Sequence, residues 1–471
     1  MSMVSGTLIP WSDLPKELVK RISKGLDTYI DVLRLRAVCT TWRSSIPPFK
    51  NSPSLPLKLQ VPILPEYTSP YGRNPDFYLI ESTVYLFQPL DDGGTSVNNN
   101  PSSSRGWLVK IMQTVDGKLR LVNPLNHKTI QVLPEDVPNK VLNLLDFRVF
   151  QVCKSYHVQY VDRSRPCFDE DHDVGHLVSK ILLMSTNYAC SSTRANHYFS
   201  LMAIHSWGQL CYFKSGDEKW TKLKDRSCEI DDIIVYKGDF CAVNRYGETT
   251  KFDSLLNETK VASRLHNTGG KKYRLVESSG QLFLVDMSSW LDTINEIKLY
   301  RLDEQQHEWT IVHTLGDRIF FAGDDCCFSV SAKDFGDCRG NCIYYTAGGI
   351  HMDILKEDGD CDRRGGWYSA FSRGHGPSFV PSGITFGHPV ISSNADDKNE
   401  GGSKSGGLSE ELVHKYKGLH GHSAGVFNIE DGKLGSLLSF LEYADIFWPP
   451  PSWLNRQDQE IKTNKQEVAE S

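Results

Sequence analysis

The 471-residue sequence predicts a multi-domain chain, with a small module of three α-helices followed by a large all-β domain, most consistent with a β-propeller of six to eight blades. Three observations support this prediction. Residues 14–43 have helical periodicity, residues 76–450 contain many short β-favouring runs, and those runs recur with a drifting period of roughly 40 to 50 residues. Because the repeats are degenerate, a pair of β-sandwiches remains the alternative for the second part.

The composition is that of a globular protein, with 39% hydrophobic and 23% charged residues. A net charge of −6 provides no basic field for a phosphate backbone, so we expect no nucleic-acid partner. No stretch approaches the roughly 20 apolar residues of a membrane span, and the first residues do not have the pattern of a signal peptide. We therefore expect no membrane association and a location in the nucleus, the cytoplasm or both, where the 12 cysteines would be reduced.

The first predicted helix covers residues 14–23, in which Leu14, Leu18 and Ile22 recur at four-residue spacing. Pro15 suits the first turn, where the missing N–H costs nothing. The apolar positions of this helix define one face.

A second helix follows a capping-box pattern that starts at Thr28, and its apolar positions are Ile30, Leu33 and Val38. A third, short helix is predicted at residues 40–45. A unit of this size rarely buries so many apolar side chains by itself, so the surplus indicates a partner surface. The surplus residues are Leu14, Leu35, Cys39 and Trp42.

Residues 13–43 contain Asp-Leu-Pro-x-Glu-Leu, then Ile22, a leucine-rich second helix and Arg-Ala-Val-Cys-x-x-Trp-Arg, and this order resembles an F-box. The F-box is the module that docks on the Skp adaptor of cullin-RING ubiquitin ligases. The resemblance implies that the adaptor-binding residues are Leu14, Pro15, Leu18, Ile22, Leu33, Val38, Cys39 and Trp42. Two other interpretations are a helical cap on the larger domain and a helix-turn-helix DNA-binding module; the interleaved acidic residues disfavour the latter.

The predicted boundaries follow from composition. The helical module occupies residues 11–46, a proline-rich linker residues 47–75, the β-domain residues 76–450 and a polar tail residues 451–471. The linker is predicted to be extended and fairly stiff.

Two pairs of strand runs show the internal repeat most clearly. The run Leu210–Phe213 is followed by Trp220–Leu223, and Leu299–Leu302 is followed at the same offset by Trp309–Val312. The copies are 89 residues apart, which corresponds to two units of 44 to 45. Such a unit is typical of a four-stranded propeller blade.

A second echo begins with glycine each time and includes Gly238–Val243, Gly280–Val285 and Gly316–Phe321. Its spacing agrees with a repeat of about 40 residues.

Several β-runs also resemble a domain of a large plant family of F-box proteins that is related to kelch-type propellers. The runs are Arg105–Lys110, Leu119–Leu125, Leu315–Phe320, Cys327–Ala332 and Gly340–Tyr345. The resemblance implies a substrate-binding propeller behind an adaptor-binding module.

The sequence predicts neither a metal site nor a catalytic pair. Four cysteines lie within 17 residues, but they lack the paired spacing of zinc ribbons, so we expect buried thiols. A histidine group is predicted to lie at the surface or in a loop, and three acidic pairs are predicted to be turn or loop residues. These sets are Cys326, Cys327, Cys338 and Cys342; His414, His420 and His422; and Asp231-Asp232, Asp324-Asp325 and Asp396-Asp397.

The sequence as a whole predicts a non-catalytic substrate-recognition subunit of a ubiquitin ligase, without cofactor or metal, that binds a Skp-type adaptor and an unknown target protein. Two alternatives remain open. One is a propeller enzyme with a metal at its hub, and the other is a propeller that sequesters a protein such as a kinase without ubiquitination.

Overall fold

The structure is a computed structural model. It describes residues 14–26, 29–47, 55–59, 76–90, 106–127, 129–130, 147–161, 178–186, 198–205, 208–223, 229–265, 271–290, 293–335, 338–346, 424–437 and 446–447. Thr28, the three histidines and the pair Asp396-Asp397 lie outside these residues.

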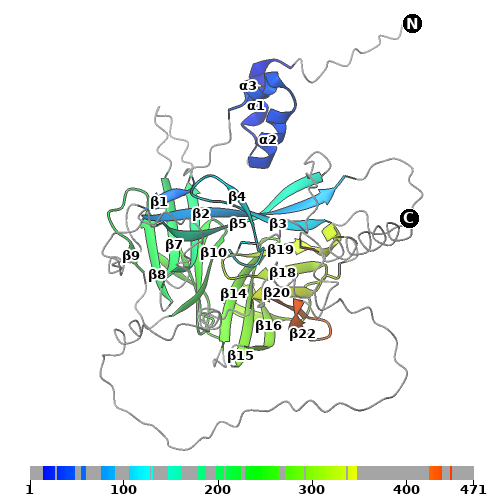
Figure 1. Cartoon of the computed structure of the whole chain (residues 1–471). Helices are drawn as coiled ribbons and strands as arrows, with labels where there is room; N and C mark the ends of the chain where they lie inside the picture. Colours follow the sequence, from blue (N-terminus) through cyan, green and yellow to red (C-terminus); the bar gives the residue numbers. More distant parts are fainter. Residues whose placement is uncertain are drawn as a thin grey trace, which may run out of the picture. The chain divides into compact units, whose positions relative to one another are not determined.

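Three short helices form the N-terminal module, as predicted (Figure 1). They are α1 Lys16–Ser23, α2 Tyr29–Ala37 and α3 Thr40–Ser45. Each helix contributes to a common core, made by Val19 of α1, Val32 of α2 and Trp42 of α3, with Ile46 beyond the last helix. Pro15 occupies the position just before α1, with φ of −53°.

The β-domain begins with nine strands. They are β1 Leu57–Leu59, β2 Asp76–Pro89, β3 Trp107–Gln113, β4 Leu119–Val122, β5 Phe147–Val161, β6 Val178–Thr186, β7 Tyr198–His205, β8 Gln209–Lys214 and β9 Thr221–Lys222. All nine strands share one sheet of order β4-β3-β2-β5-β6-β7-β8-β9, with β1 on β2. The strands β5 and β6 are joined only through the pair Tyr156 and Ile181, so the sheet divides into two blade-like halves.

Three further sheets follow along the chain (Figure 1). Two have the order β10-β11-β12-β13 and β14-β15-β16-β17, and the last has the order β19-β18-β20-β21-β22. Their strands are β10 Ile230–Tyr236, β11 Asp239–Asn244, β12 Thr249–Phe252, β13 Glu258–Ala262, β14 Lys271–Ser278, β15 Gln281–Trp290, β16 Thr293–Asp303, β17 Glu308–Val312, β18 Arg318–Ala322, β19 Cys327–Ser331, β20 Cys342–Thr346, β21 Ala424–Asn428 and β22 Leu434–Ser436. A 3₁₀ turn, η3, covers Ala332–Phe335.

The chain spacing of these units matches the predicted repeat. The groups start at Val178, Ile230, Lys271 and Arg318, which are 52, 41 and 47 residues apart. The repeated Leu and Trp runs coincide with β8 and β9 and with β16 and β17, the third and fourth strands of their groups. The 89-residue echo therefore corresponds to a step of two blades.

The glycine echo marks two hairpins of one kind. Lys237 and Gly238 connect β10 to β11, and Ser279 and Gly280 connect β14 to β15, with positive φ at all four residues. Two-residue loops with this geometry match the twist of the flanking strands. Gly316 also has positive φ, but it precedes β18, which starts a new sheet instead of completing a hairpin.

Successive sheets pack face to face through hydrophobic clusters. Phe240 and Met202 belong to the cluster between β6–β9 and β10–β13, Tyr273 and Val243 to the next, and Phe320 and Val285 to the one before the last sheet. The inner strands contact one another in the order β5, β6, β10, β14, β19 and β5 again. The sheets do not merge into one closed sheet, which is the arrangement expected of separate blades around a hub.

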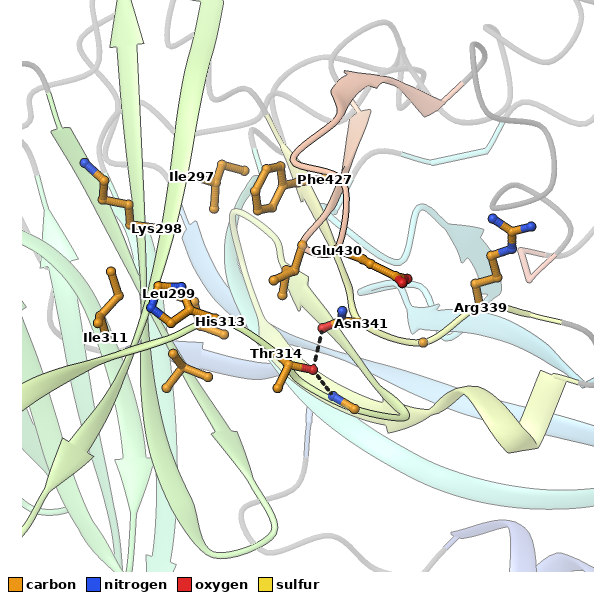
Figure 2. A pocket seen from close by; sticks show the side chains of 14 residues that line it. Ile297, Lys298, Leu299, Ile311, His313, Thr314, Arg339, Asn341, Phe427 and Glu430 are labelled. Atoms are coloured by element: carbon orange, nitrogen blue, oxygen red, sulfur yellow. Dashed lines mark hydrogen bonds between the residues drawn. The ribbon is translucent and has the colours of Figure 1, made fainter.

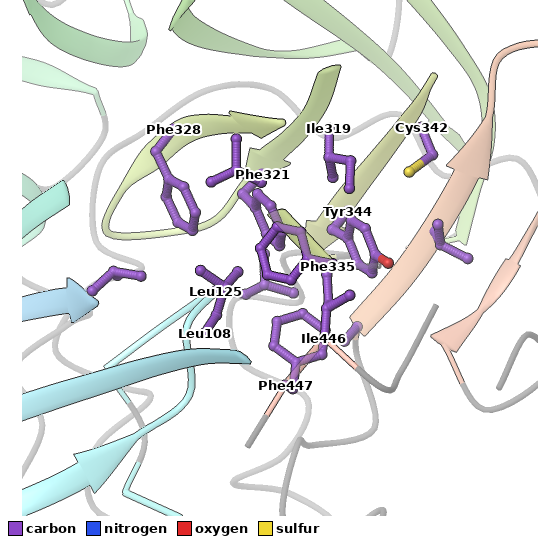
Figure 3. Packing of buried hydrophobic residues seen from close by; sticks show 14 of the residues in the cluster. Leu108, Leu125, Ile319, Phe321, Phe328, Phe335, Cys342, Tyr344, Ile446 and Phe447 are labelled. Carbon is purple, nitrogen blue, oxygen red and sulfur yellow. The ribbon is translucent and has the colours of Figure 1, made fainter. Parts of the chain in front are cut away.

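The last described residues of the chain pack on the first blade (Figure 3). Phe447 forms a parallel bridge with Leu108 of β3, and the Leu108 amide donates to the Ile446 carbonyl at 2.7 Å. The ring of Phe447 meets Phe321 and Tyr344 edge to face, with centroids 6.1 and 5.5 Å apart. The two ends of the β-domain thus share one core.

Part of the proline-rich segment, residues 47–75, belongs to the β-sheet, so this part is not only a spacer between two domains. Residues Leu57–Leu59 form β1 and pair with β2, and Leu59 is buried beside Leu79. The segment is extended there, as predicted, but it is held by the β-domain.

Candidate functional site

Four aliphatic side chains of the helical module are exposed. Leu18 and Ile22 on α1 are 47% and 44% exposed, Leu33 on α2 is 38% exposed, and Val38 just after α2 is 53% exposed. Leu18 and Ile22 are four residues apart and lie on one face of α1. Pro15, at the start of that helix, is also exposed.

The other three predicted adaptor-binding residues lie deeper. Trp42 is 4% exposed and belongs to the core of the module, and Leu14 and Cys39 are half-buried against that core. Cys39 precedes α3, and its sulfur accepts a hydrogen bond from the Trp42 amide at 3.4 Å. All eight predicted residues therefore belong to one small module, but only five present an exposed side chain.

The apolar surplus inferred from the sequence exists, but on different residues. Leu35, Leu14, Cys39 and Trp42 complete the internal core, while Leu18, Ile22, Leu33 and Val38 make the exposed set. Helical periodicity shows that a helix has an apolar face, but it does not show which apolar residues the neighbouring short helices cover.

A second constellation lies at the inner strands, where buried charges connect one sheet to the next. The ammonium of Lys180 on β6 contacts the Asp232 carboxylate on β10 at 2.6 Å, and both side chains are almost fully buried. The second oxygen of Asp232 accepts the Leu275 amide of β14 at 2.8 Å. One carboxylate thus joins three inner strands.

The connection continues from β14 to the last sheet. Arg274 donates to the Asp231 carbonyl at 3.2 Å and to the Asp324 carboxylate at 3.1 Å, in the segment before β19. Thr346 of β20 donates to the same oxygen of Asp324 at 2.8 Å.

The neighbouring residue, Asp325, connects these charges to the first blade. Lys110 of β3 contacts it at 2.6 Å, and the Ser155 hydroxyl of β5 donates to the same oxygen at 3.1 Å. Lys110 also donates to the Asn126 carbonyl at 2.9 Å, so its charge is well coordinated. We call Lys110, Lys180, Asp232, Arg274, Asp324 and Asp325 the hub charges.

Ionic partners set the pKa values of Lys180 and Asp325. Burial alone would lower the pKa of Lys180, but the adjacent Asp232 carboxylate raises it. Burial likewise opposes ionisation of Asp325, yet Lys110 holds its pKa below the usual value. Lys180 and Asp325 therefore stay charged at neutral pH.

Two further groups at the hub have pKa values shifted toward neutrality. Burial raises the pKa of Asp231 to about 6, although the carboxylate accepts the Tyr273 amide at 3.1 Å. The positive charge of Arg274, together with burial, lowers the pKa of Lys272 to about 8.

The structure contradicts the turn or loop prediction for one acidic pair and confirms it for another. Asp231 and Asp232 lie within strand β10, and Asp232 is fully buried. Asp324 and Asp325 lie in the connection between β18 and β19, as expected for loop residues, but Asp325 is buried. One signal was available, since Lys180 is the only charged residue of β6.

The four neighbouring cysteines partly agree with the prediction. Cys326 and Cys342 are buried, and Cys327 and Cys338 are half-buried. Within the described ranges, no three His, Cys, Asp or Glu side chains converge as a metal-binding group. No helix in the described part of the chain is long and apolar enough to cross a membrane.

A pocket of about 960 Å³ lies between β16 and β17 on one side and the last sheet on the other (Figure 2). Its walls combine aliphatic and aromatic side chains with charged ones, including Ile297, Ile311, Phe427, Lys298, Arg339 and Glu430. One rim is fixed by hydrogen bonds, since Thr314 donates to the Asn341 side chain at 3.3 Å and accepts the Gly316 amide at 3.1 Å.

Family comparisons agree with both parts of the fold. Residues 11–50 match the F-box domain, and residues 77–372 match the KIB1-4 β-propeller. The propeller assignment of the β-domain follows from the second match.

Three relatives come from Arabidopsis thaliana. F-box protein SKIP23 is 27% identical over 95% of this chain and 96% of its own length. The putative F-box protein At5g60060 is 33% identical over 73% and 90%, and F-box protein At2g17036 is 26% identical over 97% and 97%. Since these proteins share both parts of the chain or most of it, the chain belongs to the family of plant F-box proteins with a KIB1-4 β-propeller.

Proposed function

We propose that this chain is the substrate-recognition subunit of an SCF-type cullin-RING ubiquitin ligase. The F-box would bind the Skp-type adaptor, and the propeller would bind a target protein for ubiquitination and degradation. In this role the chain performs no catalysis; it raises the local concentration of target lysines near the transferred ubiquitin. The proposed location is the nucleus, the cytoplasm or both.

The observation that carries the proposal is the exposed aliphatic set of the F-box, formed by Leu18, Ile22, Leu33 and Val38. Burial of a whole aliphatic side chain contributes about 1.5 to 3 kcal/mol, so a half-exposed one still offers about 1 kcal/mol to a partner. Four such residues supply less than the roughly 8 kcal/mol of a micromolar complex. The adaptor interface must therefore extend to neighbouring atoms, and exposed Pro15 is its predicted edge.

The buried position of Trp42 changes how the adaptor-binding residues should be tested. Replacing Trp42 would remove the centre of the three-helix core, so lost adaptor binding could reflect lost folding. Leu18 and Ile22 can be replaced without emptying that core.

The test uses the full chain and purified Skp adaptor, with binding measured by calorimetry. We expect Leu18→Glu combined with Ile22→Glu to weaken adaptor binding at least 100-fold, because two charges would enter an apolar interface. Lys20→Glu is the matched control, since Lys20 is exposed on the other flank of Val19. Binding of the double variant within twofold of the wild type would overturn the proposed interface.

A second experiment addresses the fate of the target. Proximity labelling in cells with the wild-type chain and with the Leu18→Glu, Ile22→Glu chain should identify the same propeller-bound proteins. Degradation predicts that those proteins accumulate only with the variant. Equal levels in both cell lines would instead favour sequestration without ubiquitination.

A further inference from the structure

Strand β16 extends beyond its outer neighbour β17, and the pocket of about 960 Å³ lies where the extension begins. Strand β16 covers Thr293–Asp303, but β17 pairs only with Leu299–Asp303. The remaining stretch, Thr293–Lys298, pairs with β15 on one side, and no strand in the part of the chain that the structure describes pairs with its other side. Ile297 and Lys298 of this stretch line the pocket (Figure 2). We call the space beside Thr293–Lys298 the β16 gap.

The walls of the β16 gap are fixed by one residue, Asn341. Its side-chain oxygen accepts the Leu315 amide at 2.7 Å and the Thr314 hydroxyl at 3.3 Å, which holds the chain that leaves β17. Its backbone carbonyl accepts the Ile429 amide at 3.0 Å, just beyond β21. The chain that would otherwise continue β17 is thus tied to the last sheet, and the gap is preformed.

The two faces of β16 at the gap differ in chemistry. Ile297 is buried, and Phe427 and Ile429 pack against the cluster to which it belongs. Ile297 and Phe427 lie next to each other in Figure 2. On the other face, the Lys298 ammonium contacts the Glu296 carboxylate at 3.0 Å. A strand placed in the gap would therefore direct every second side chain to an apolar wall and the others to a charged pair.

The open edge favours a strand over a helix as its occupant. In an antiparallel sheet, alternate residues direct their amide and carbonyl to each side, so this stretch of β16 offers unpaired donors and acceptors. An added strand can pair with them, whereas the backbone groups of a helix are bonded within the helix. Strand β13 is also an outer strand, but none of its residues lines the pocket. The apolar wall therefore distinguishes the β16 gap from this other edge.

We propose that the β16 gap binds an extended segment of the target protein as an added strand. The segment would continue β17 along Thr293–Lys298, and its alternate, apolar side chains would contact Ile297, Phe427 and Ile429. Main-chain hydrogen bonds would supply affinity, and the apolar wall would supply specificity. This inference rests on the proposed function, because it names how the target of that function is recognised.

The test selects short peptides from a random phage-displayed library on the purified full chain, without adaptor. The tightest peptide is then synthesised with one backbone amide methylated at a time, and binding is measured by calorimetry. Since an added strand bonds through alternate residues, we expect methylation to weaken binding about tenfold at every second position and to be tolerated between them. Tolerance at all positions, sensitivity without this alternation, or a library that yields no binding peptide would overturn the proposal.

Hydrogen exchange and one variant locate the bound peptide. The peptide should slow exchange of alternate amides in Thr293–Lys298 and leave the exchange of β13, Glu258–Ala262, unchanged. Ile429→Arg should weaken peptide binding about tenfold or more, because it places a charge in the apolar wall. Leu255→Arg is the matched control, since Leu255 is 79% exposed and does not line the pocket. Melting curves show whether Ile429→Arg is folded, and the exchange measurement needs no variant. Protection of other strands instead of β16 would refute the site.

This proposal and the proposed function fail separately. The Leu18→Glu, Ile22→Glu chain should bind the peptide within twofold of the wild type, and Ile429→Arg should bind the Skp adaptor within twofold. Adaptor binding without peptide binding in the wild-type chain would overturn only the strand-addition site. Peptide binding without adaptor binding would support that site and overturn the ligase role.

Discussion

Lys180 and Asp232 are 2.6 Å apart in the interior, and Lys237 and Glu304 are 2.6 Å apart at the surface. The distance is the same, but the loss of one partner has different consequences. A buried carboxylate left without its cation keeps the full penalty of desolvation, whereas an exposed one is hydrated.

We therefore expect Lys180→Met to lower the free energy of unfolding by about 3 to 5 kcal/mol. Lys237→Met should leave the free energy of unfolding unchanged within error, because water and salt screen that pair. Urea unfolding of the two variants at pH 7 measures both values. An equal effect of the two substitutions would show that burial of the Lys180 and Asp232 pair does not increase the cost of losing one partner.

The raised pKa of Asp231 predicts a pH dependence. A carboxyl whose folded pKa lies above its unfolded value favours folding in its protonated form; this contribution is complete below the unfolded pKa near 4 and is lost as pH rises through about 6. Relative to the wild type, Asp231→Asn should have similar stability at pH 4 and be more stable by about 2 to 3 kcal/mol above pH 7. Asparagine can still accept the Tyr273 amide.

Stability curves of the wild type and Asp231→Asn between pH 4 and 8 test this prediction, since their difference cancels the other titrating groups. Glu218→Gln is the control, because it removes a carboxylate that is exposed at the surface. A constant difference for Asp231→Asn across this range would contradict the assignment.

At the scale of elements, the hairpin between β14 and β15 shows how a short sequence echo specifies structure. Ser279 and Gly280 both have positive φ, at 54° and 76°. This conformation favours asparagine followed by glycine, and a side chain at the second position introduces strain.

We expect Gly280→Ala to lower the free energy of unfolding by about 1 to 2 kcal/mol, because of the left-handed conformation. Ser279→Asn should raise it by a few tenths to about 1 kcal/mol, since asparagine tolerates that conformation better. No side-chain clash complicates Gly280→Ala, because no atom lies within 4 Å of the position of its Cβ. Opposite signs for the two variants in thermal unfolding would confirm the turn; a stabilising alanine would refute it.

The elements were more predictable than their order in space. Each β-favouring run falls on a strand because the run and the turn that follows it are local properties of the chain. In the last sheet, β18 lies between β19 and β20, and it pairs in parallel with β20. The sequence runs that begin at Gly280 and Gly316 are similar, yet the strands that follow them pair differently. The runs could not show this, because strand pairing depends on residues far away in the sequence.

Within the F-box the same limit applies. Three helices were predicted from caps and periodicity, and the structure has them at Lys16–Ser23, Tyr29–Ala37 and Thr40–Ser45. Which apolar residues remain exposed depends on how three short helices pack. The sequence pattern therefore assigned exposed apolar surface to Trp42, whereas the structure exposes Leu18 and Ile22.

At the scale of the whole β-domain, closure depends on contacts between residues far apart in sequence. Gly323, before β19, approaches the Leu125 carbonyl so closely that a Cβ would overlap it, and the Asp324 amide donates to that carbonyl at 2.9 Å. The hub charges join the same two regions through Lys110 and Asp325. The hub charges and the apolar cluster around Phe447 therefore connect the same two sheets.

This arrangement predicts that Phe447, although it is one of the last described residues, stabilises the whole β-domain. Phe447→Ala should lower the free energy of unfolding by about 3 to 5 kcal/mol, because it removes a ring that is 1% exposed and contacts Phe321 and Tyr344. The matched control is Phe150→Ala on β5, where the ring is 49% exposed and a much smaller loss is expected. Hydrogen exchange should show faster exchange in β3 and β18 for Phe447→Ala, since these strands line the cluster that Phe447 completes. If exchange accelerates only beside residue 447 and the unfolding free energy stays at the wild-type value, then the C-terminal segment does not close the ring of blades.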